Sequence, residues 1–444
     1  MNPDGSPCKT ERYATMTRPQ SDRLVMKFGG TSMGDLERIR RAARIVAAEA
    51  ASGKKLAVVV SAMAGKTNEL VAWTDGAGRP APALASRGVV LSDDEYDVVV
   101  ASGEQVTSGL LALTLRNMGL NARSWMGWQI PILTDDAHGR ARIEDVPGEV
   151  LGAALDKGEI AIVPGFQGVT RDGRITTLGR GGSDTSAVAV AAALGCSCDI
   201  YTDVDGVYTT DPRIESRARR LEKVSYEEML EMASLGAKVL QTRSVELAMA
   251  KQVPVRVLSS FIEPDENGRL PAESGTLICD EEEIVEKRIV SGVTMSRDEA
   301  RITLLGLSDR IEAPADVFTR LADANVNVDM IVQSQARSEG AVNLTFTTGR
   351  RDAPRAAELM RAAQAEIGFE EIRVDEDVAK VSVVGVGMRS HAGVAQTMFR
   401  ALADKGVKFQ AISTSEIKIS VLIDAAYAEL AVRALHSAYG LEAV

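Results

Sequence analysis

A chain of 444 residues is too long for one compact core, so we expect two or three domains. Its composition, 45% hydrophobic and 25% charged, is ordinary for a globular protein, and a formal net charge of −11 excludes a nucleic-acid partner bound through bulk positive charge. No apolar run approaches the ~18 residues that cross a bilayer, and no signal-peptide core stands at the start, so the sequence predicts a cytoplasmic protein with no membrane partner.

The cysteines and histidines do not form a metal-binding pattern. The cysteines stand at positions 8, 196, 198 and 279, and the three histidines are scattered at 138, 391 and 436. Neither the paired spacing of a zinc site nor a nearby histidine is present. We therefore expect reduced thiols and no protein-bound metal.

The first residues with chemical interest follow a polar, proline-containing extension. Residues 1–22 show no periodicity and predict a flexible segment. Residues 24–28 are typical of a buried strand that ends in Gly29-Gly30, and a helix is expected from about residue 35 to 52.

A second strand, at 56–61, leads into a near match to a phosphate-binding loop. The pattern GxxxxGK[ST] fits from position 60, except that Val60 replaces the first glycine. That glycine is where the loop bends so that its N–H groups surround phosphate. We therefore interpret Ser61 and Thr67 as helix caps or hydroxyl donors at a strand end.

A Gly-, Pro- and Ala-rich surface excursion at 74–92 precedes a long helix, expected from about 93 to 118. This helix carries Glu104 in the phrase ASGEQ. A helical glutamate is usually just solvated, so its role depends on what it faces. Strands near Ile130 and at 160–166 continue the alternation of strand and helix.

The stretch TTLGRGGSDTSAVAVAAALG, residues 176–195, organises the chain. Its glycines allow the backbone to approach a ligand closely, Ser183 and Asp184 are suited to cap a helix, and the helix start favours an anion. Arg180 can hold a carboxylate or phosphate with two hydrogen bonds. A site for an anionic small molecule and a tight turn before a helix both explain this segment alone.

A second polar loop follows the strand at 198–202. It carries Asp203, Asp205 and Asp211, together with Tyr208 and Arg213. A loop stabilised by Asx turns explains these residues, but ligands also bind at the carboxyl ends of strands in open α/β sheets, where Tyr208 could border a base. A helix at 225–235 then leads to a lysine, Lys238, and the strand at 253–260 closes the first unit.

The composition shifts to Pro, Glu and Asp at 261–290, which predicts a linker. Beyond it, ITLLGL at 302–307 corresponds to VSVVGV at 381–386, and LAD at 321–323 to LAD at 402–404. This spacing predicts two copies, at 291–370 and 371–444, of a strand-helix-strand-strand-helix-strand unit.

Together these segments resemble the aspartate kinases, members of the amino-acid kinase family that carry tandem ACT regulatory units. The phrases VMKFGGTS, VVSAMAGKTNEL, TLGRGGSDTSA, YTDVDGVYTTDPR and GAKVL occur in the family's order. The resemblance implies an α/β fold: an amino-acid kinase domain at 23–260, with a mostly parallel sheet between helix layers, and then two ferredoxin-like ACT units. It implies transfer of the ATP γ-phosphoryl group to the side-chain carboxylate of L-aspartate, giving 4-phospho-L-aspartate for lysine, threonine and methionine synthesis.

The resemblance also assigns roles to residues that match the family's motifs. The catalytic residues would be Lys27 and Asp184. Residues that hold aspartate would be Ser61, Thr67, Glu104, Arg180, Gly181, Gly182 and Ser183. Residues that line ATP would be Lys27, Phe28, Gly29, Gly30, Thr202, Asp203, Tyr208, Arg213 and Lys238, with Mg²⁺ arriving on the nucleotide.

An amino-acid effector, threonine or lysine or both, and a homo-oligomer formed through the ACT units are further implications. The regulatory pocket would use Asp309, Asn327, Asp329, Gln333, Ser415 and Glu416. The family's usual Asn-Ile pair is replaced by Lys408-Phe409, and a lysine side chain would be repelled by Lys408. We therefore expect lysine alone to inhibit poorly and threonine, or threonine with lysine, to act more strongly.

Two alternative functions remain open from the sequence. One is another amino-acid kinase, with glutamate, an acylated glutamate or a nucleoside monophosphate as substrate; the paired repeats and Glu104 favour aspartate. The other is an amino-acid-sensing ACT regulator with a silent kinase domain. Lys27, Asp184 and Lys238 argue against it, since charged groups are costly to bury without a use.

Overall fold

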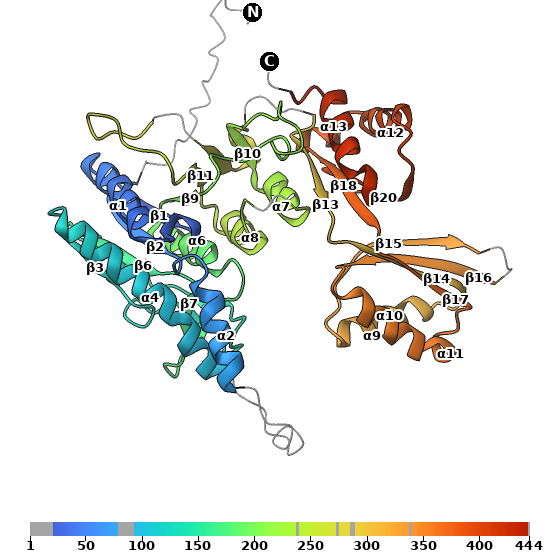
Figure 1. Cartoon of the computed structure of the whole chain (residues 1–444), viewed down its shortest axis with the longest axis horizontal. Coiled ribbons are helices and arrows are strands. Elements are labelled where there is room, and N and C mark those ends of the chain that lie inside the picture. Colours follow the sequence, from blue (N-terminus) through green and yellow to red (C-terminus); the bar gives the residue numbers. More distant parts are fainter. Residues whose placement is uncertain are drawn as a thin grey trace, which may run out of the picture.

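The computed structural model describes residues 21–78, 93–236, 239–271, 275–284, 289–336 and 340–442, which form a larger N-terminal part and a smaller C-terminal part (Figure 1). The N-terminal part is built on a sheet with strand order β10-β12-β11-β9-β1-β2-β6-β3. Its strands are β1 (Arg23–Phe28), β2 (Lys55–Val60), β3 (Ala122–Ser124), β6 (Ile160–Pro164), β9 (Ser197–Thr202), β10 (Lys223–Ser225), β11 (Val255–Ser259) and β12 (Thr276–Cys279). The β11–β12 pair is antiparallel and the other pairs are parallel, which confirms the mostly parallel sheet.

Helices cover both faces of this sheet. One face packs on α1 (Leu36–Ala51) and α4 (Asp94–Asn117), with α2 (Lys66–Gly78) beside α4. The other face packs on α5 (Glu149–Asp156), α6 (Gly182–Leu194), α7 (Tyr226–Ser234) and α8 (Thr242–Lys251). Because side chains alternate along a strand, Val25 and Lys27 of β1 point to the α6 face, whereas Met26 and Phe28 point to the α1 face.

A smaller sheet flanks the carboxyl edge of the main one. It has the order β5-β4-β7-β8 and consists of β4 (Leu133–Thr134), β5 (Ile143–Asp145), β7 (Gln167–Val169) and β8 (Ile175–Thr177). The strand expected near Ile130 begins at Leu133, and Ile130 itself is buried in the preceding turn. Strand β8 runs directly into the glycine-rich loop, so this sheet supports the loop.

The C-terminal part contains two antiparallel sheets with separate hydrophobic cores. The first has the order β15-β16-β14-β17 and the second β13-β18-β20-β19. The strands are β13 (Gly292–Ser296), β14 (Ala300–Ser308), β15 (Val328–Gln335), β16 (Ala341–Thr348), β17 (Glu371–Asp375), β18 (Val378–Val384), β19 (Phe409–Thr414) and β20 (Lys418–Asp424). The helices are α9 (Ala313–Asp323), α10 (Ala353–Ala362), α11 (Gln364–Ile367), α12 (Val394–Asp404) and α13 (Ala428–Ala438), and both units are ACT-like.

Two expected boundaries differ from the structure. Strand β13 lies inside the range expected for the first repeat, yet it pairs with β18 of the second, so the first unit is inserted into the second. The expected linker, 261–290, contributes β12, which fills the place between β10 and β11. Both differences arise from pairing between strands far apart in the chain, which local patterns do not reveal.

The two parts are joined by contacts of α7 and the 207–220 loop with the second ACT-like unit. Glu228 on α7 accepts hydrogen bonds from the Ser291 hydroxyl, 2.6 Å, and from the Val386 N–H, 2.9 Å. Lys418 on β20 pairs with Glu231 on α7 at 2.9 Å. These contacts join α7 of the N-terminal part directly to the second ACT-like unit.

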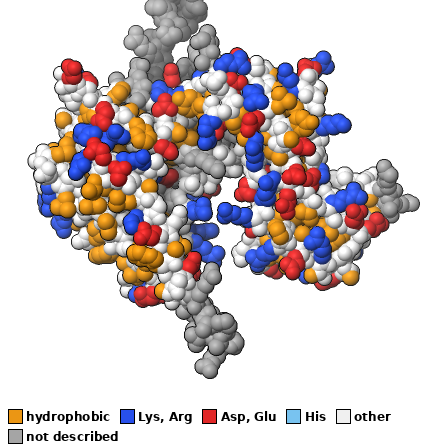
Figure 2. Space-filling model, viewed as in Figure 1, with side chains coloured by type: hydrophobic (Ala, Val, Ile, Leu, Met, Phe, Trp, Pro, Cys, Tyr) orange, Lys and Arg blue, Asp and Glu red, His pale blue; other side chains and the backbone are white. Residues whose placement is uncertain are grey.

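The surface and the long helix bear on possible partners. Figure 2 shows acidic and basic side chains interspersed over the visible face of both parts. Within the described ranges, α4 alone is long and apolar enough to cross a membrane by length and composition. It packs on the sheet, however, and buries the carboxyl side chains of Asp97 and Glu104, as a core helix of a globular protein does.

Candidate active site

The site is built at the carboxyl ends of the parallel strands β1, β2 and β9. The Gly29 N–H donates to the Tyr201 carbonyl at 3.3 Å, and the Ser61 N–H donates to the Phe28 carbonyl at 3.1 Å. A Cβ on Gly29 would lie 3.4 Å from Lys27 Nζ, and one on Gly30 would lie 3.2 Å from the Ala62 carbonyl oxygen. Side chains at these two positions would contact Lys27 and the Ala62 carbonyl, so the glycines leave the backbone beside Lys27 uncovered.

Lys27 forms an ion pair with Asp184, and both side chains are about nine-tenths buried. Lys27 reaches the pair because it shares the α6 face of β1, and Asp184 lies in the first turn of α6. A carboxylate is favoured at a helix start. The pair thus holds an ammonium group next to the Gly29-Gly30 turn.

The glycine-rich loop presents Arg180 to solvent. Gly179 and Gly181 have φ angles of +74° and +72°, which side-chain-bearing residues adopt rarely, and a Cβ on Gly181 would lie 2.0 Å from Cγ of Gln241. Ser183 is buried in the first turn of α6. Arg180 is exposed, and no other described residue forms an ion pair or hydrogen bond with its side chain. Its guanidinium is available for an anion.

Glu104 is buried at the same edge of the sheet, with 3% of its surface exposed. Its Oε1 accepts the Ala62 N–H at 3.0 Å, while Oε2 has no hydrogen-bond partner among the described residues. Burial raises the pKa of Glu104 to about 7. Gly103 permits the close contact, since a Cβ there would lie 2.9 Å from Cβ of Ala62. A buried acceptor oxygen without a partner suits a ligand ammonium group.

Several residues expected to line the nucleotide already have hydrogen-bond or ion-pair partners within the protein. Thr202 donates to Asp203 at 3.1 Å, and Tyr208 donates to Asp205 at 3.0 Å. Arg213 is exposed but already paired with Asp211 at 2.7 Å. The Phe28 ring is fully buried and stacked on Tyr201 with ring centres 4.8 Å apart, so the backbone of Phe28 is the part that could line the nucleotide. Lys238 lies outside the described residues.

Ser61 and Thr67 flank the turn that follows β2, and both are half-buried. The turn also contains Ala62, whose N–H binds Glu104. The structure thus brings these two hydroxyl residues and Glu104 to one edge of the sheet.

The expected regulatory residues do not form one enclosed pocket in a single chain. Asp309, Asn327, Gln333 and Ser415 have exposed side chains. Asp329 is paired with Lys380 of the second unit, and Glu416 lies 3.4 Å from Arg389. Lys380 also pairs with Glu299 at 2.7 Å and is itself buried, so Asp329 belongs to a contact between the two units.

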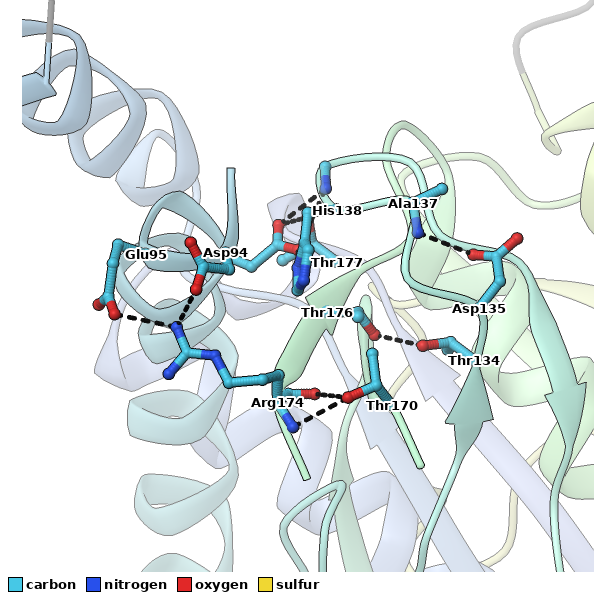
Figure 3. Close-up of polar contacts among 12 residues, drawn as sticks. Asp94, Glu95, Thr134, Asp135, Ala137, His138, Thr170, Arg174, Thr176 and Thr177 are labelled. Atoms are coloured by element: carbon cyan, nitrogen blue, oxygen red, sulfur yellow. Dashed lines mark hydrogen bonds and ion pairs between the residues drawn. The ribbon is translucent and has the colours of Figure 1, made fainter. Parts of the chain in front are cut away.

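Sequence reasoning missed Asp97 and His138, whose carboxylate and Nδ1 lie 2.8 Å apart. Figure 3 shows His138 within the polar network around the smaller sheet. Asp97 is fully buried and stands seven residues before Glu104 on α4. That spacing is two helical turns, so both acids face the same side, and the periodicity could have identified it. Among the residues that the structure describes, no three His, Cys, Asp or Glu side chains converge as a metal site would require.

Comparison with known proteins gives consistent matches. A model of the amino acid kinase family matches residues 22–259, and an ACT domain model matches residues 381–439. An aspartate kinase of Pseudomonas putida is 49% identical over 95% of this chain and 98% of its own, and aspartokinase 2 of Bacillus subtilis is 45% identical over 94% and 98%. The solved structure of E. coli aspartokinase III in complex with aspartate and ADP is similar with a TM-score of 0.73 at 30% identity, covering 94% of this chain and 99% of that one.

Proposed function

This chain belongs to the aspartate kinases of the amino acid kinase family, and from this premise we propose how its own residues perform the reaction. The enzyme transfers the γ-phosphoryl group of ATP to the side-chain carboxylate of L-aspartate and so forms 4-phospho-L-aspartate. Neither a glutamate-type kinase nor a silent amino-acid sensor is favoured, since relatives matched over nearly the whole chain are aspartate kinases.

Aspartate is held between Glu104 and Arg180. The observation that carries this assignment is the buried Oε2 of Glu104, which has no hydrogen-bond partner among the described residues. The substrate ammonium supplies the missing donor, and Arg180 binds a substrate carboxylate with its unpaired guanidinium. Ser61, Thr67, Ser183 and the N–H group of Gly181 provide further donors around the amino acid. Gly182 contributes by its small size instead, since its N–H donates to the Gly179 carbonyl at 3.1 Å.

The first prediction concerns pH. Glu104 is neutral below a pKa of about 7 and must be ionised to bind an ammonium group. The value of kcat/KM for aspartate should therefore rise as pH increases through about 7, although the substrate's own groups do not titrate there. In Glu104→Gln the KM for aspartate should rise by about tenfold or more, and this pH dependence should disappear. Steady-state kinetics between about pH 6 and 8 give both quantities.

Glu95→Gln is the matched control, because Glu95 lies on the same helix, is exposed, and pairs with Arg174 outside the site. It should retain the wild-type KM and pH profile. A Glu104→Gln variant with the wild-type slope would show that another group titrates, and would remove Glu104 from the aspartate site.

Lys27 neutralises the phosphoryl group as it moves. Phosphoryl transfer needs charge neutralisation and in-line positioning more than covalent help, and the attacking carboxylate is already ionised near neutral pH. Asp184 fixes the direction of the Lys27 side chain through their ion pair. The N–H group of Gly30 is the backbone donor that we assign to a phosphate oxygen, since the Gly29 N–H already donates to the Tyr201 carbonyl.

We assign the remaining nucleotide contacts to Thr202, Asp203, Tyr208, Arg213 and Lys238, and Mg²⁺ to the phosphates of ATP. Magnesium is commonly held by one or two carboxylates together with substrate phosphates and water. Bound this way, the ion would offset charge on the β- and γ-phosphates. Arg213 donates to Asp211 through Nε and Nη2, which leaves its Nη1 group for the nucleotide.

Regulation is assigned to the ACT-like units in an oligomer. E. coli aspartokinase III has been solved in complex with lysine and aspartate, and its structure is similar to this one with a TM-score of 0.74 at 29% identity. Here β15 is an edge strand that carries exposed Ile331, and β19 is an edge strand that carries exposed Ile412. The two edge strands contact each other within the chain, and their exposed isoleucines support contact with a second copy. An amino-acid effector bound at these units would act on α7 through Glu228 and Glu231.

Lysine alone should inhibit poorly, and threonine, or threonine with lysine, should inhibit more strongly. Lys408 adds a cation near the expected pocket. Asp329 already forms an ion pair with Lys380, so its charge is neutralised and it attracts the ammonium group of a lysine effector less strongly. An effector shifts an equilibrium only through its different affinities for two states. Titrating activity with each amino acid, alone and combined, is the measurement. Strong inhibition by lysine alone at sub-millimolar concentration would contradict this assignment.

We place the enzyme in the cytoplasm, where ATP and aspartate are available. The described cysteines, Cys196, Cys198 and Cys279, are buried and unpaired, which suits a reducing compartment.

A further inference from the structure

Asp97 is a fully buried carboxylate that the reaction itself does not use. It accepts hydrogen bonds from Nδ1 of His138 at 2.8 Å, from the Gly139 N–H at 3.0 and 3.1 Å, and from the Thr177 hydroxyl. Figure 3 shows His138 and Thr177 side by side near the start of α4. A buried charge is retained only when it is well paired, and here both oxygens are used.

The donors come from two segments that touch the glycine-rich loop. Thr177 ends β8 and stands three residues before Arg180. The Ala141 N–H donates to the Thr177 carbonyl at 2.9 Å, and a Cβ on Gly179 would lie 3.2 Å from the Gly139 carbonyl oxygen. The loop that carries Arg180 therefore rests on the 137–141 turn, which Asp97 holds.

Arg243 on α8 also links the glycine-rich loop to the 137–141 turn. Its guanidinium donates to the Leu178 carbonyl at 2.6 Å and to the Ala141 carbonyl at 3.1 Å. The Arg180 loop is thus fixed against the 137–141 turn at two points, and the turn is fixed to α4 through Asp97.

Helix α4 links this anchor to Glu104. Seven residues separate Asp97 from Glu104, which is a rise of about 10.5 Å along a rigid helix on the same face. The positions of Glu104 and Arg180 are therefore fixed relative to each other through Asp97, which links α4 to the 137–141 turn.

We propose that Asp97 is a positioning residue that sets the separation between Glu104 and Arg180, and thereby the affinity for aspartate. The proposal rests on the aspartate-binding roles assigned to those two residues above. Asp97 makes no contact with substrate in this scheme; it acts through the 137–141 turn and β8. His138 is its partner, since its Nδ1–H supplies one of the three donors.

Asp97→Asn tests this directly, because an amide at this position presents an N–H group to one of the donors. The KM for aspartate should rise by about tenfold, while the KM for ATP changes by less than about twofold. His138→Ala should raise the KM for aspartate several-fold, and His138→Asn, whose amide can donate from the place of Nδ1, should restore most of it. Thermal denaturation of each variant reports on folding.

Arg174→Ala is the matched control, because it removes the pairs with Asp94 and Glu95 on the same helix start without touching Asp97. It should leave the KM for aspartate unchanged. Equal rises in both KM values, or an unchanged KM for aspartate in folded Asp97→Asn and His138→Ala, would overturn the proposal.

Arg180→Ala and Glu104→Gln are measured in parallel to separate two failures. If these two variants leave the KM for aspartate unchanged, the assigned binding roles fail. If they raise it and the Asp97 and His138 variants do not, only the positioning role fails.

Discussion

Replacing Lys27 with methionine is expected to lower kcat by about a hundredfold or more, with much smaller changes in either KM. A hundredfold loss corresponds to about 2.7 kcal/mol of transition-state stabilisation. The physical reason is the position of Lys27: its ammonium is buried beside the Gly29-Gly30 turn and directed by Asp184. There it acts on negative charge as it develops on the transferring group, in a site that water screens weakly.

Initial rates with both substrates varied separate kcat from each KM. Lys55→Met is the matched control, since Lys55 lies on neighbouring β2 but pairs on the surface with Asp22 and Asp156. It should keep the wild-type kcat. Because Lys27→Met leaves Asp184 buried without its partner, thermal denaturation of the variant is needed as well. A folded Lys27→Met enzyme with unchanged kcat would exclude the assigned role.

Arg180→Ala should raise the KM for aspartate by roughly ten- to a hundredfold and leave the KM for ATP nearly unchanged. A hydrogen bond between charged groups contributes about 1.5–3 kcal/mol, and a two-pronged contact reaches the upper end of that range. Arg180 is exposed and pairs with no other described residue, so its removal breaks nothing inside the protein. The KM change is therefore a direct reading of substrate binding.

Arg171→Ala serves as the control for Arg180, because Arg171 is an exposed arginine of the neighbouring turn that pairs with Glu144. It should retain both KM values. A rise in the KM for ATP equal to that for aspartate in Arg180→Ala would place Arg180 at the nucleotide instead.

Much of the kinase part was predictable because its strands, turns and helices follow from patterns within short segments. Buried strands, glycine turns and a small-residue helix predicted the alternation of strand and helix and the loop around Arg180, and the family resemblance implied the mostly parallel sheet. The opposite orientation of Phe28 was also within reach, because side chains alternate on a strand and Lys27 and Phe28 cannot both face the ligand. The motif carried Phe28 into the site, whereas its ring belongs to the core.

Other features depend on pairings between distant segments. The insertion of the first ACT-like unit into the second follows from β13 pairing with β18, more than eighty residues along the chain, and no local pattern encodes it. The pairing of Lys380 with Asp329 likewise joins two units that look alike in sequence. Asp97 was partly predictable. Its seven-residue spacing from Glu104 can be read from the sequence, but its hydrogen-bond donors come from turns whose conformation the sequence does not reveal.

The central claim is that this site forms an acyl phosphate on aspartate, and trapping that product with hydroxylamine tests it most directly. With MgATP and L-aspartate the enzyme should yield aspartyl hydroxamate, at a rate that depends on aspartate. L-Glutamate and a reaction without amino acid are the comparisons. Product that forms equally well without aspartate, or only with glutamate, would contradict the claim.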